Sequence, residues 1–547
     1  MHRFPAFVLI ALAVSPALGG EPPAISADAI RAHVEFLSDD LLEGRAAGSR
    51  GYELATLYVT SQMRQTGLEP AGDAGDWLQW LDLIEATRVL PAAELVVHGG
   101  GGRDERLTPI DDFIPGFYFG ATSTGVTAPA VYAGYGIHAP ELGHDDFAGI
   151  DLTGRIAVVL AGAPARFPNS QRAHYSSRAK TEGLVARGAI GIVTVDTPEE
   201  ETRVPWARKI RLSWTPRMRL LDSAGQPIDA YPEIRGSASV SVAAAERLFA
   251  GSPMDAAAVF AAARAGRFAS FAMPVEFTLT AKNALARAKS ANVVGLLRGS
   301  DPLLSNEYVV MTAHLDHIGR GAAVNGDVIY NGAFDNASGV AIMLETARAL
   351  AESSGRPRRS ILVVAVTAEE RGLLGSDHFA RHPTVPRDAL VANVNTDMPV
   401  ALYPVAGMTL YGAEHSSIGA QARAALAAEG LAEVPDATPE EVYFVRSDQY
   451  SFVRQGIPAI MVDTGDLSSD SGVDAAAVMR QFMLRDYHMP SDSVALPIHW
   501  PSLARLARVN AELTRVIADA DGRPQWLPGD FFGATFGRTP PAGGAAD

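Results

Sequence analysis

The sequence contains no cysteine among its 547 residues. Disulfide bonds are therefore excluded, and so is attachment of a lipid to an N-terminal cysteine. Any bound metal must be held by histidine and carboxylate side chains, because thiolate ligands are missing. An exported chain without disulfides is more typical of a bacterial periplasm or culture medium than of an animal ectodomain, where disulfides are common.

Positive charge is also scarce, since 46 Lys and Arg residues stand against 62 Asp and Glu residues, for a formal net charge of −16. Nucleic acid is not expected as a partner, because phosphate binding requires a basic surface. The cationic side chains that do cluster lie between residues 203 and 219. A solvated loop is the plainer interpretation of this cluster, and a rim that guides substrate is the alternative. Its members are Arg203, Arg208, Lys209, Arg211, Arg217 and Arg219.

No apolar run is long enough to span a bilayer. The longest candidate, residues 4–18, falls short of the roughly 20 residues that a spanning helix needs. Arg3 precedes this run, and Ala17-Leu18-Gly19 at its end has the small residues of a signal-peptide cleavage site. We therefore expect residues 1–20 to be a removed signal peptide. The mature protein would be exported, periplasmic or secreted, with no stable membrane anchor.

The length exceeds what one ordinary core holds, so at least two domains are expected. Short β-branched runs from about residue 120 predict a compact β-rich unit. From about residue 274 to residue 517, strands and helices alternate, which predicts an α/β fold with a mostly parallel sheet flanked by helices. The predicted strands of this region are 308–313, 360–366, 390–395 and 457–463, and the predicted helices are 337–351, 373–381, 416–428 and 502–517.

Acidic and imidazole side chains follow these strands at the points where they end. In such sheets, sites form beyond the carboxyl ends of the strands, so the side chains are expected to gather at one edge. Singly, each has an ordinary explanation as a structural histidine, a helix cap or surface charge. Together, the carboxylates would repel one another unless cations neutralised them. The residues are His314, Asp316, Asp335, Glu369, Glu370, Asp397 and His488.

The charge balance favours two dications. Asp335, Glu370 and Asp397 supply three negative charges, two Zn²⁺ ions supply four positive charges, and one bound hydroxide suits the remainder. Histidine and carboxylate ligands suit zinc, although manganese or cobalt could bind. Two metals roughly 3.5–4 Å apart could share the hydroxide and polarise a carbonyl.

The motifs around these residues resemble, in order, those of the M28 family of zinc peptidases. The segment 38–45 is also similar to the N-terminal part of these enzymes, and segments 132–136 and 180–195 resemble a protease-associated (PA) domain. The M28-like motifs are Ala313-His314-Leu315-Asp316-His317, residues 332–339, residues 368–376, Asn395-Thr396-Asp397-Met398 and Tyr487-His488.

The resemblance implies a division of the chain. Residues 1–20 would be the signal peptide and residues 21–119 the N-terminal part of the peptidase domain. Residues 120–272 would be an inserted PA domain with its following helices. Residues 273–535 would be the catalytic zinc peptidase domain, and residues 536–547 a disordered tail rich in Gly, Pro and Ala.

The resemblance also implies a ligand set for two zinc ions per chain. His314 and Asp397 would bind one ion, and Glu370 and His488 the other. Asp335 would bridge the two.

Further roles follow from the same resemblance. Glu369 would be the general base that takes a proton from the bridging water and passes it to the leaving amine. Asp316 would orient His314, and Asp492 would serve His488 in the same way. Tyr487 would stabilise the oxyanion, with a packed aromatic ring as the alternative. The peptide bond after Asp335 is expected to be cis. Glutamine stands at position 449, where the family usually has histidine, which puts pocket shape or local hydrogen bonding in doubt.

The leading functional hypothesis is an exported exopeptidase that acts on peptides and releases N-terminal residues. A carboxypeptidase or dipeptidase on the same scaffold is an alternative, which would need a basic group such as Arg446 or Arg480 to grip a substrate carboxylate. A glutaminyl cyclase with a single zinc is another. A non-enzymatic, receptor-like ectodomain fits poorly, because receptor relatives have lost metal ligands.

Overall fold

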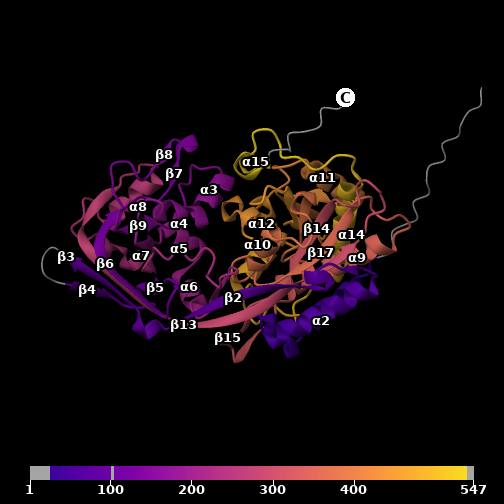
Figure 1. The fold of residues 1–547 in the computed structure, drawn as a ribbon, viewed down its shortest axis with the longest axis horizontal. Coiled ribbons are helices and arrows are strands. Elements are labelled where there is room, and N and C mark those ends of the chain that lie inside the picture. Colours follow the sequence, from indigo (N-terminus) through magenta and orange to yellow (C-terminus); the bar gives the residue numbers. More distant parts are fainter. Residues whose placement is uncertain (1–24, 100–103, 539–547) are drawn as a thin grey trace, which may run out of the picture.

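The computed structural model describes residues 25–99 and 104–538, which form two lobes joined side by side (Figure 1). One lobe is an α/β unit and the other is rich in β-strands. Two long strands, β2 (Leu78–Arg88) and β13 (Phe271–Leu297), run between them. The predicted signal peptide and most of the predicted C-terminal tail lie outside the described residues. None of the helices in the described ranges is long and apolar enough to cross a bilayer.

A parallel sheet forms the centre of the α/β lobe. Its strands run in the order β17 (Ser360–Val366), β14 (Tyr308–His314), β18 (Leu390–Asn395) and β21 (Ala459–Thr464). The end of β13 pairs with β17, and β19 (Gly407–Tyr411) pairs with β21, both antiparallel. The four predicted strands are confirmed, because runs of apolar residues buried on both faces are what a covered parallel sheet requires.

Helices cover both faces of this sheet. Alternate residues of a strand face opposite sides, so Val309 and Val363 enter one core while Val310 and Leu362 enter the other. The first core is covered by α1 (Ala27–Leu37), α2 (Arg50–Gln65), α9 (Gly339–Glu352), α11 (Ile418–Ala428), α13 (Ala475–Arg485) and α14 (Trp500–Asp519). The second is covered by α10 (Leu374–Arg381), α12 (Gln449–Val453) and α15 (Phe531–Phe536). The predicted mixed α/β fold is therefore confirmed.

The β-rich lobe is built on a second sheet. Its first strands, β3 (Glu94–Gly99), β4 (Asp104–Leu107) and β5 (Phe113–Pro115), precede residue 120, where the sequence places the start of the insert. β3 pairs with residues 275–280 of β13, so these strands belong to this lobe. The remaining sheet strands are β6 (Ser123–Tyr132), β9 (Ile156–Leu160), β10 (Gly191–Val195) and β12 (Ser237–Val240).

Helices and smaller strands complete the structure. The helices of the β-rich lobe are α3 (Asn169–Ser176), α4 (Arg178–Val185), α5 (Pro198–Arg203), α6 (Trp206–Leu212), α7 (Val242–Phe249) and α8 (Ala256–Arg264). The remaining strands are β1 (Glu69–Pro70), β7 (His138–Ala139), β8 (His144–Asp145), β11 (Arg217–Leu220), β15 (Gly319–Val324), β16 (Asp327–Tyr330) and β20 (Ala432–Glu433).

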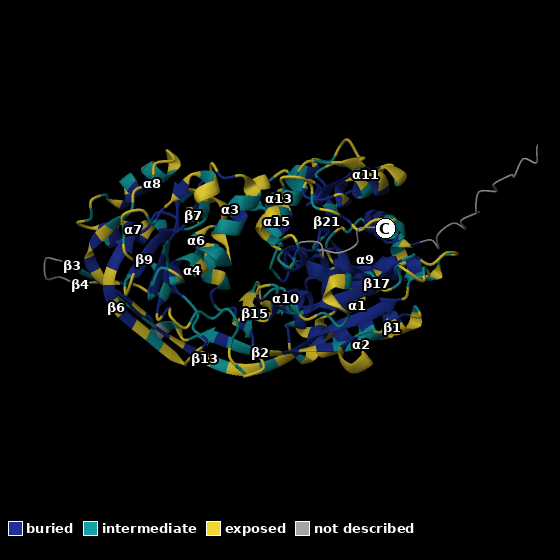
Figure 2. Cartoon of the chain, turned by 45° about the horizontal axis from the view of Figure 1, so that its top comes forward, coloured by how far each residue is buried: buried dark blue, intermediate teal, exposed yellow. Residues whose placement is uncertain are grey.

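Strand β13 belongs to both sheets and crosses the predicted boundary at residues 272/273. Its first part pairs with β6 and β3, its middle with β2, and its last residues with β17. Figure 2 shows alternating exposed and buried residues along the first part, which faces solvent on one side, whereas the last residues are buried. A single continuous strand therefore fixes the two lobes relative to each other.

Candidate active site

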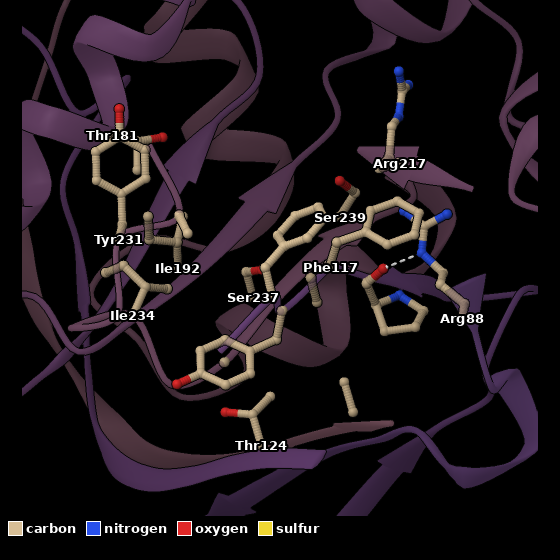
Figure 3. Close-up of a pocket in the computed structure, with 18 of the residues that line it drawn as sticks. Arg88, Phe117, Thr124, Thr181, Ile192, Arg217, Tyr231, Ile234, Ser237 and Ser239 are labelled. Atoms are coloured by element: carbon tan, nitrogen blue, oxygen red, sulfur yellow. Dashed lines mark hydrogen bonds between the residues drawn. The ribbon is translucent and has the colours of Figure 1, made fainter. Parts of the chain in front are cut away.

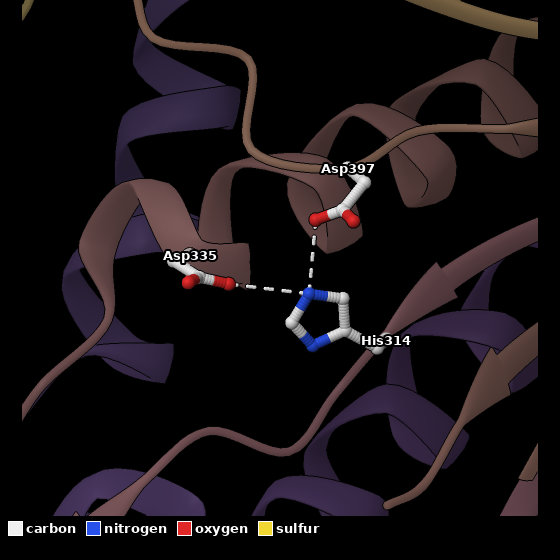
Figure 4. A group of neighbouring side chains, drawn as sticks. All are labelled: His314, Asp335 and Asp397. Atoms are coloured by element: carbon white, nitrogen blue, oxygen red, sulfur yellow. Dashed lines mark hydrogen bonds and ion pairs between the residues drawn. The ribbon is translucent and has the colours of Figure 1, made fainter. Parts of the chain in front are cut away.

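Three of the predicted metal ligands meet at the carboxyl ends of neighbouring strands (Figure 4). His314 is the last residue of β14, Asp397 lies just beyond β18, and Asp335 lies in the turn before α9. Nε2 of His314 lies 2.9 Å from Oδ1 of Asp397 and 3.2 Å from Oδ1 of Asp335. One imidazole nitrogen thus faces two carboxylate oxygens, which is the arrangement of a metal-binding group.

A second group lies on the other side of Asp335. Nε2 of His488 is 3.2 Å from Oδ2 of Asp335 and 3.4 Å from Oε2 of Glu370. Nδ1 of His317 is 2.7 Å from Oε1 of Glu370 and 3.8 Å from Oδ2 of Asp335. The two oxygens of Asp335 therefore face different groups. The peptide bond between Asp335 and Asn336 is cis, as the sequence predicts.

This arrangement fits bound cations. Carboxylates from several elements converge here in a largely buried environment, where their mutual repulsion is little screened. Within residues 25–99 and 104–538, both ring nitrogens of His317 and Oε1 of Glu370 are buried without a hydrogen bond of good geometry, although Nδ1 and Oε1 lie close together. Buried polar atoms that have no protein hydrogen-bond partner are the donor set that a metal ion would use. The five predicted ligands are all brought together at this position.

Glu369 lies immediately before Glu370, at the end of the segment that follows β17. Burial raises the pKa of Glu369 well above its usual range. The negative charges of Asp397, Glu370 and Asp448 raise it further, while the nearby His314 opposes the shift. A carboxyl group with a raised pKa beside the converging ligands is a candidate to exchange a proton during the reaction.

The contacts of Asp316 differ from the expectation. The backbone carbonyl of Asp316, and not its carboxylate, lies 3.0 Å from Nδ1 of His314. The carboxylate instead accepts a hydrogen bond from the backbone N–H of Glu369, at 3.1 Å. The chain turns directly after β14, so the carbonyl rather than the side chain faces the imidazole. Burial is the main reason that the pKa of Asp316 is raised to about 6.

Asp492 stabilises the turn around Asp335. The sequence predicted instead that it would orient His488. Its two carboxylate oxygens accept hydrogen bonds from the backbone N–H groups of Phe334, at 2.9 Å, and Asp335, at 3.0 Å. Burial raises the pKa of Asp492 to about 6. The sequence spacing places Asp492 near the site, but its hydrogen-bond partners depend on a loop 157 residues away.

Arg45 is a supporting residue to which the sequence assigns no role. Its guanidinium is buried and donates hydrogen bonds to the backbone carbonyls of Leu37, Leu315, Asn331 and Gly332. The carbonyls of Leu315, Asn331 and Gly332 belong to the segments that carry His314 and Asp335. Burial lowers the pKa of Arg45 to about 10, against the attraction of the nearby carboxylates. The only sequence signal was its place at the end of the segment 38–45.

Tyr487 and Gln449 occupy different surroundings. The ring centroids of Tyr487 and His488 lie 3.9 Å apart, and the guanidinium of Arg208 lies 5.0 Å from the Tyr487 ring. Burial, with the charge of Asp335, raises the pKa of Tyr487 well above its usual range. Gln449 is fully buried and accepts a hydrogen bond from Asn395 at 2.7 Å. The residue at position 449 therefore affects the hydrogen bonding of Asn395, the last residue of β18.

His317 is the site residue that sequence reasoning missed. It stands in the same motif as His314 and Asp316, three residues after the end of the strand. Nothing in the periodicity of the chain distinguishes it from a structural histidine. Its presence in a motif already rich in candidate ligands was the available signal.

The part of the chain that carries the site is similar to known peptidases. Residues 292–514 match the model of peptidase family M28. Aminopeptidase NAALADL1 of Mus musculus is 32% identical over 136 residues, which cover 24% of this chain and 16% of that protein. Aminopeptidase YwaD of Bacillus subtilis is 36% identical over 107 residues, which cover 20% of this chain and 21% of that protein. These matches thus span about a fifth or less of the relatives' own lengths.

A solved aminopeptidase from Aneurinibacillus sp. strain AM-1 is similar over nearly the whole chain. The alignment covers 91% of this chain and 95% of that structure, with a TM-score of 0.53 and 19% sequence identity. This likeness shows that the fold is shared.

Proposed function

Because residues 292–514 form a domain of peptidase family M28, we propose that the chain is an exported two-zinc peptidase that releases residues from the free amino terminus of peptides. The observation that carries the two-metal proposal is the position of Asp335. Its Oδ1 faces His314 and its Oδ2 faces His488, each at 3.2 Å. A carboxylate with one oxygen toward each group is suited to bridge two ions.

The proposed ligands divide between the two ions as the motifs imply. His314 and Asp397 would hold one ion, Glu370 and His488 the other, with Asp335 shared. Two bound zinc ions would polarise the scissile carbonyl and make water a better nucleophile. The zinc assignment rests on the imidazole and carboxylate donor set, together with the family.

Glu369 would act as the general base. Its neighbour Glu370 contributes to a ligand group, whereas the Glu369 carboxyl group has no ion-pair partner among the described residues. It is therefore free to accept a proton from the attacking water and to deliver it to the leaving amine. Tyr487, beside His488, would donate a hydrogen bond to the oxyanion.

The preference for an amino terminus is supported by Asp463. The parallel register pairs Asn395 with Met461, so Asp397, just beyond β18, and Asp463, in β21, each lie two residues after that pair. Among the described residues, the carboxylate of Asp463 accepts hydrogen bonds only from the adjacent Thr464. Burial raises the pKa of Asp463 well above its usual range, and the charge of Asp397 raises it further. A substrate ammonium group would neutralise this carboxylate.

Export and the role of the β-rich lobe complete the proposal. The apolar segment at the start of the chain supports export to the periplasm or the medium. The segments 132–136 and 180–195 support a PA domain in the β-rich lobe. This lobe lies beside the proposed site, because Arg208 of α6 contacts Tyr487.

The test is the cleavage of a peptide set by the zinc-loaded full-length mature chain, with products identified by mass spectrometry. Each peptide is supplied with a free and with an acetylated amino terminus. Stepwise loss of single residues from the free form only is the expected result. Loss of residues from the carboxyl end would favour the carboxypeptidase alternative, and conversion of N-terminal glutamine to pyroglutamate would favour the cyclase.

A further inference from the structure

A cavity of about 440 Å³ lies where the β-rich lobe meets the segment that follows Glu370 (Figure 3). Most of its wall comes from β5, β10, β11 and β12 and the loops beside them, and Arg371 and Gly372 complete it. Its volume is that of a site for a small ligand or for part of a larger one. None of the predicted metal ligands lines it, so it is separate from the site described above.

The wall of this cavity carries a net positive charge, whereas the whole chain carries a net negative charge. Its Asp, Glu, Lys and Arg side chains are one carboxylate, Asp229, and four guanidinium groups, those of Arg88, Arg217, Arg219 and Arg371. Asp229 is already paired with Arg178 and, at 3.5 Å, with Arg381, which lie outside the wall. Within the described residues, none of the four wall arginines has a carboxylate within ion-pair distance.

Arg88 and Arg219 are held in place by backbone carbonyls and aromatic rings, without a counter-ion among the described residues. Arg88 donates hydrogen bonds to the backbone carbonyls of Pro115, at 2.6 Å, and Ser213, at 2.8 Å, and its guanidinium stacks 3.7 Å from the Phe117 ring centroid. Burial, followed by repulsion from Arg217, lowers the pKa of Arg88 to about 9. An anion in the cavity would relieve this repulsion.

The other two wall arginines, Arg371 and Arg217, offer free hydrogen-bond donors. Arg371 is buried and donates one hydrogen bond to the carbonyl of Ile318, while its Nε and Nη1 have no hydrogen-bond partner in the described part of the chain. Arg217 has an exposed side chain that extends away from Arg88 in Figure 3. A carboxylate accepts such guanidinium donors readily, often two at a time.

The cavity is electrostatically connected to the proposed reaction site. Burial and the charge of Arg371 lower the pKa of Arg217, and the charges of Glu370 and Glu369 oppose this shift. Arg371 follows Glu370 directly in the chain. Asp463 lies near the end of β21, whereas Glu369 and Glu370 follow β17, and these are the two outer strands of the order β17, β14, β18, β21. The molecule therefore presents a negative group on one side of the converging ligands and a cluster of positive groups on the other.

We propose that this cavity binds a carboxylate of the peptide substrate, on the leaving-group side of the scissile bond. The proposal rests on the proposed peptidase function and specifies its substrate class as peptides that carry a carboxylate beyond the bond to be cut. The carboxylate is either the free C-terminus of a short peptide or an acidic side chain. With the ammonium end at Asp463, the two opposite charges orient the peptide.

The experiment compares matched peptides that differ only in the carboxylate. One arm pairs short peptides that end in a free acid with the same peptides ending in an amide. The other arm pairs amidated pentapeptides that carry Glu or Gln at the second, third, fourth or fifth position. We expect about tenfold higher kcat/KM for the charged member of at least one pair, through KM. The responding arm identifies the source of the carboxylate.

The outcomes separate this proposal from the one on which it rests. Equal turnover within every pair would overturn the carboxylate site while leaving the peptidase function standing. Failure to cleave any peptide would overturn the peptidase function, and the carboxylate site with it.

A pair of variants then locates the preference in the cavity. Arg217→Gln removes an exposed wall charge, and Arg267→Gln removes an exposed charge after α8, outside the wall. The ratio of kcat/KM between charged and neutral peptides should fall toward one in Arg217→Gln and persist in Arg267→Gln. Because other wall arginines could hold the anion, Arg219→Gln is measured as well. A ratio unchanged in both wall variants would contradict the proposal.

Discussion

Nδ1 of His317 lies 2.7 Å from Oε1 of Glu370, in a position where both atoms are buried. The same imidazole lies 3.8 Å from Oδ2 of Asp335, and its ring centroid is 5.8 Å from that of His488. Two imidazoles thus flank the two carboxylates of one proposed metal group. His317 is positioned either to ligate the ion directly or to fix the orientation of Glu370.

Replacing His317 by Gln should therefore weaken zinc binding about 10- to 100-fold, the usual cost of removing a group that orients a ligand. The measurement is competition for zinc with a chromogenic chelator. His138→Gln is the matched control, since His138 is an exposed histidine of the β-rich lobe that contacts Asp145. Equal zinc affinity in the wild type and His317→Gln would show that the imidazole is only packed beside the site.

Asp335→Asn should reduce the affinity for both ions, because this residue faces both groups. Asp397→Asn should affect one ion more than the other, since Asp397 contacts only His314 among the proposed ligands. Zinc stoichiometry measured by mass spectrometry of metal content, during stepwise removal with a chelator, distinguishes the two variants. Retention of both ions by Asp335→Asn would contradict the bridging assignment.

Glu369→Gln should keep the zinc content and lose turnover, by at least about 10²-fold, because an amide cannot take a proton from water. Glu370→Gln is the neighbouring comparison and should lose zinc, since Glu370 contacts His317 and His488. Initial rates and metal content are measured on the same preparations. Peptidase activity of Glu369→Gln equal to that of the wild type would exclude its role as the base.

The sequence predicted the positions of the site residues better than their contacts. β17 and β18 were located to the residue, because apolar runs buried on both faces leave a clear pattern, and the ligands that follow such strands could be placed with them. The predicted side-chain partners of Asp316 and Asp492 differ from those in the structure, because the direction of a side chain in a turn depends on tertiary contacts. β13 gave no clear pattern, since polar residues such as Lys282, Asn283 and Lys289 interrupt it and its partners are distant in the chain.

Asp492→Asn should lower the free energy of unfolding by about 1–3 kcal/mol, because one of two buried N–H groups would face the amide NH₂ and lose its acceptor. The N–H groups are those of Phe334 and Asp335, so the variant should also weaken zinc binding. Urea unfolding of the metal-free protein measures the stability effect separately from the zinc effect. Asp486→Asn, in the same loop, controls for the loss of one charge. An unchanged unfolding midpoint would mean that the turn has another support.

Glu345 provides a pH-dependent contribution to stability away from the site. Burial alone would raise the pKa of Glu345. Contacts with His33, at 3.5 Å, and Arg348, at 2.7 Å, outweigh burial and lower this pKa to about 2. Its value in the unfolded chain is close to 4.5. The contribution is therefore fully present above pH 4.5 and is lost as the pH falls toward 2. A difference of about 2.5 pKa units corresponds to roughly 3 kcal/mol.

Glu345→Gln should accordingly be less stable than the wild type by up to about 3 kcal/mol at pH 6, and the difference should shrink between pH 4.5 and pH 2.5. Urea unfolding of both proteins at a series of pH values, without metal, measures this difference. Glu352→Gln removes the exposed partner of Arg348 and serves as the control, with an expected effect below about 1 kcal/mol. A Glu345→Gln deficit that stays constant down to pH 2.5 would show that the loss comes from packing and not from the ion pairs.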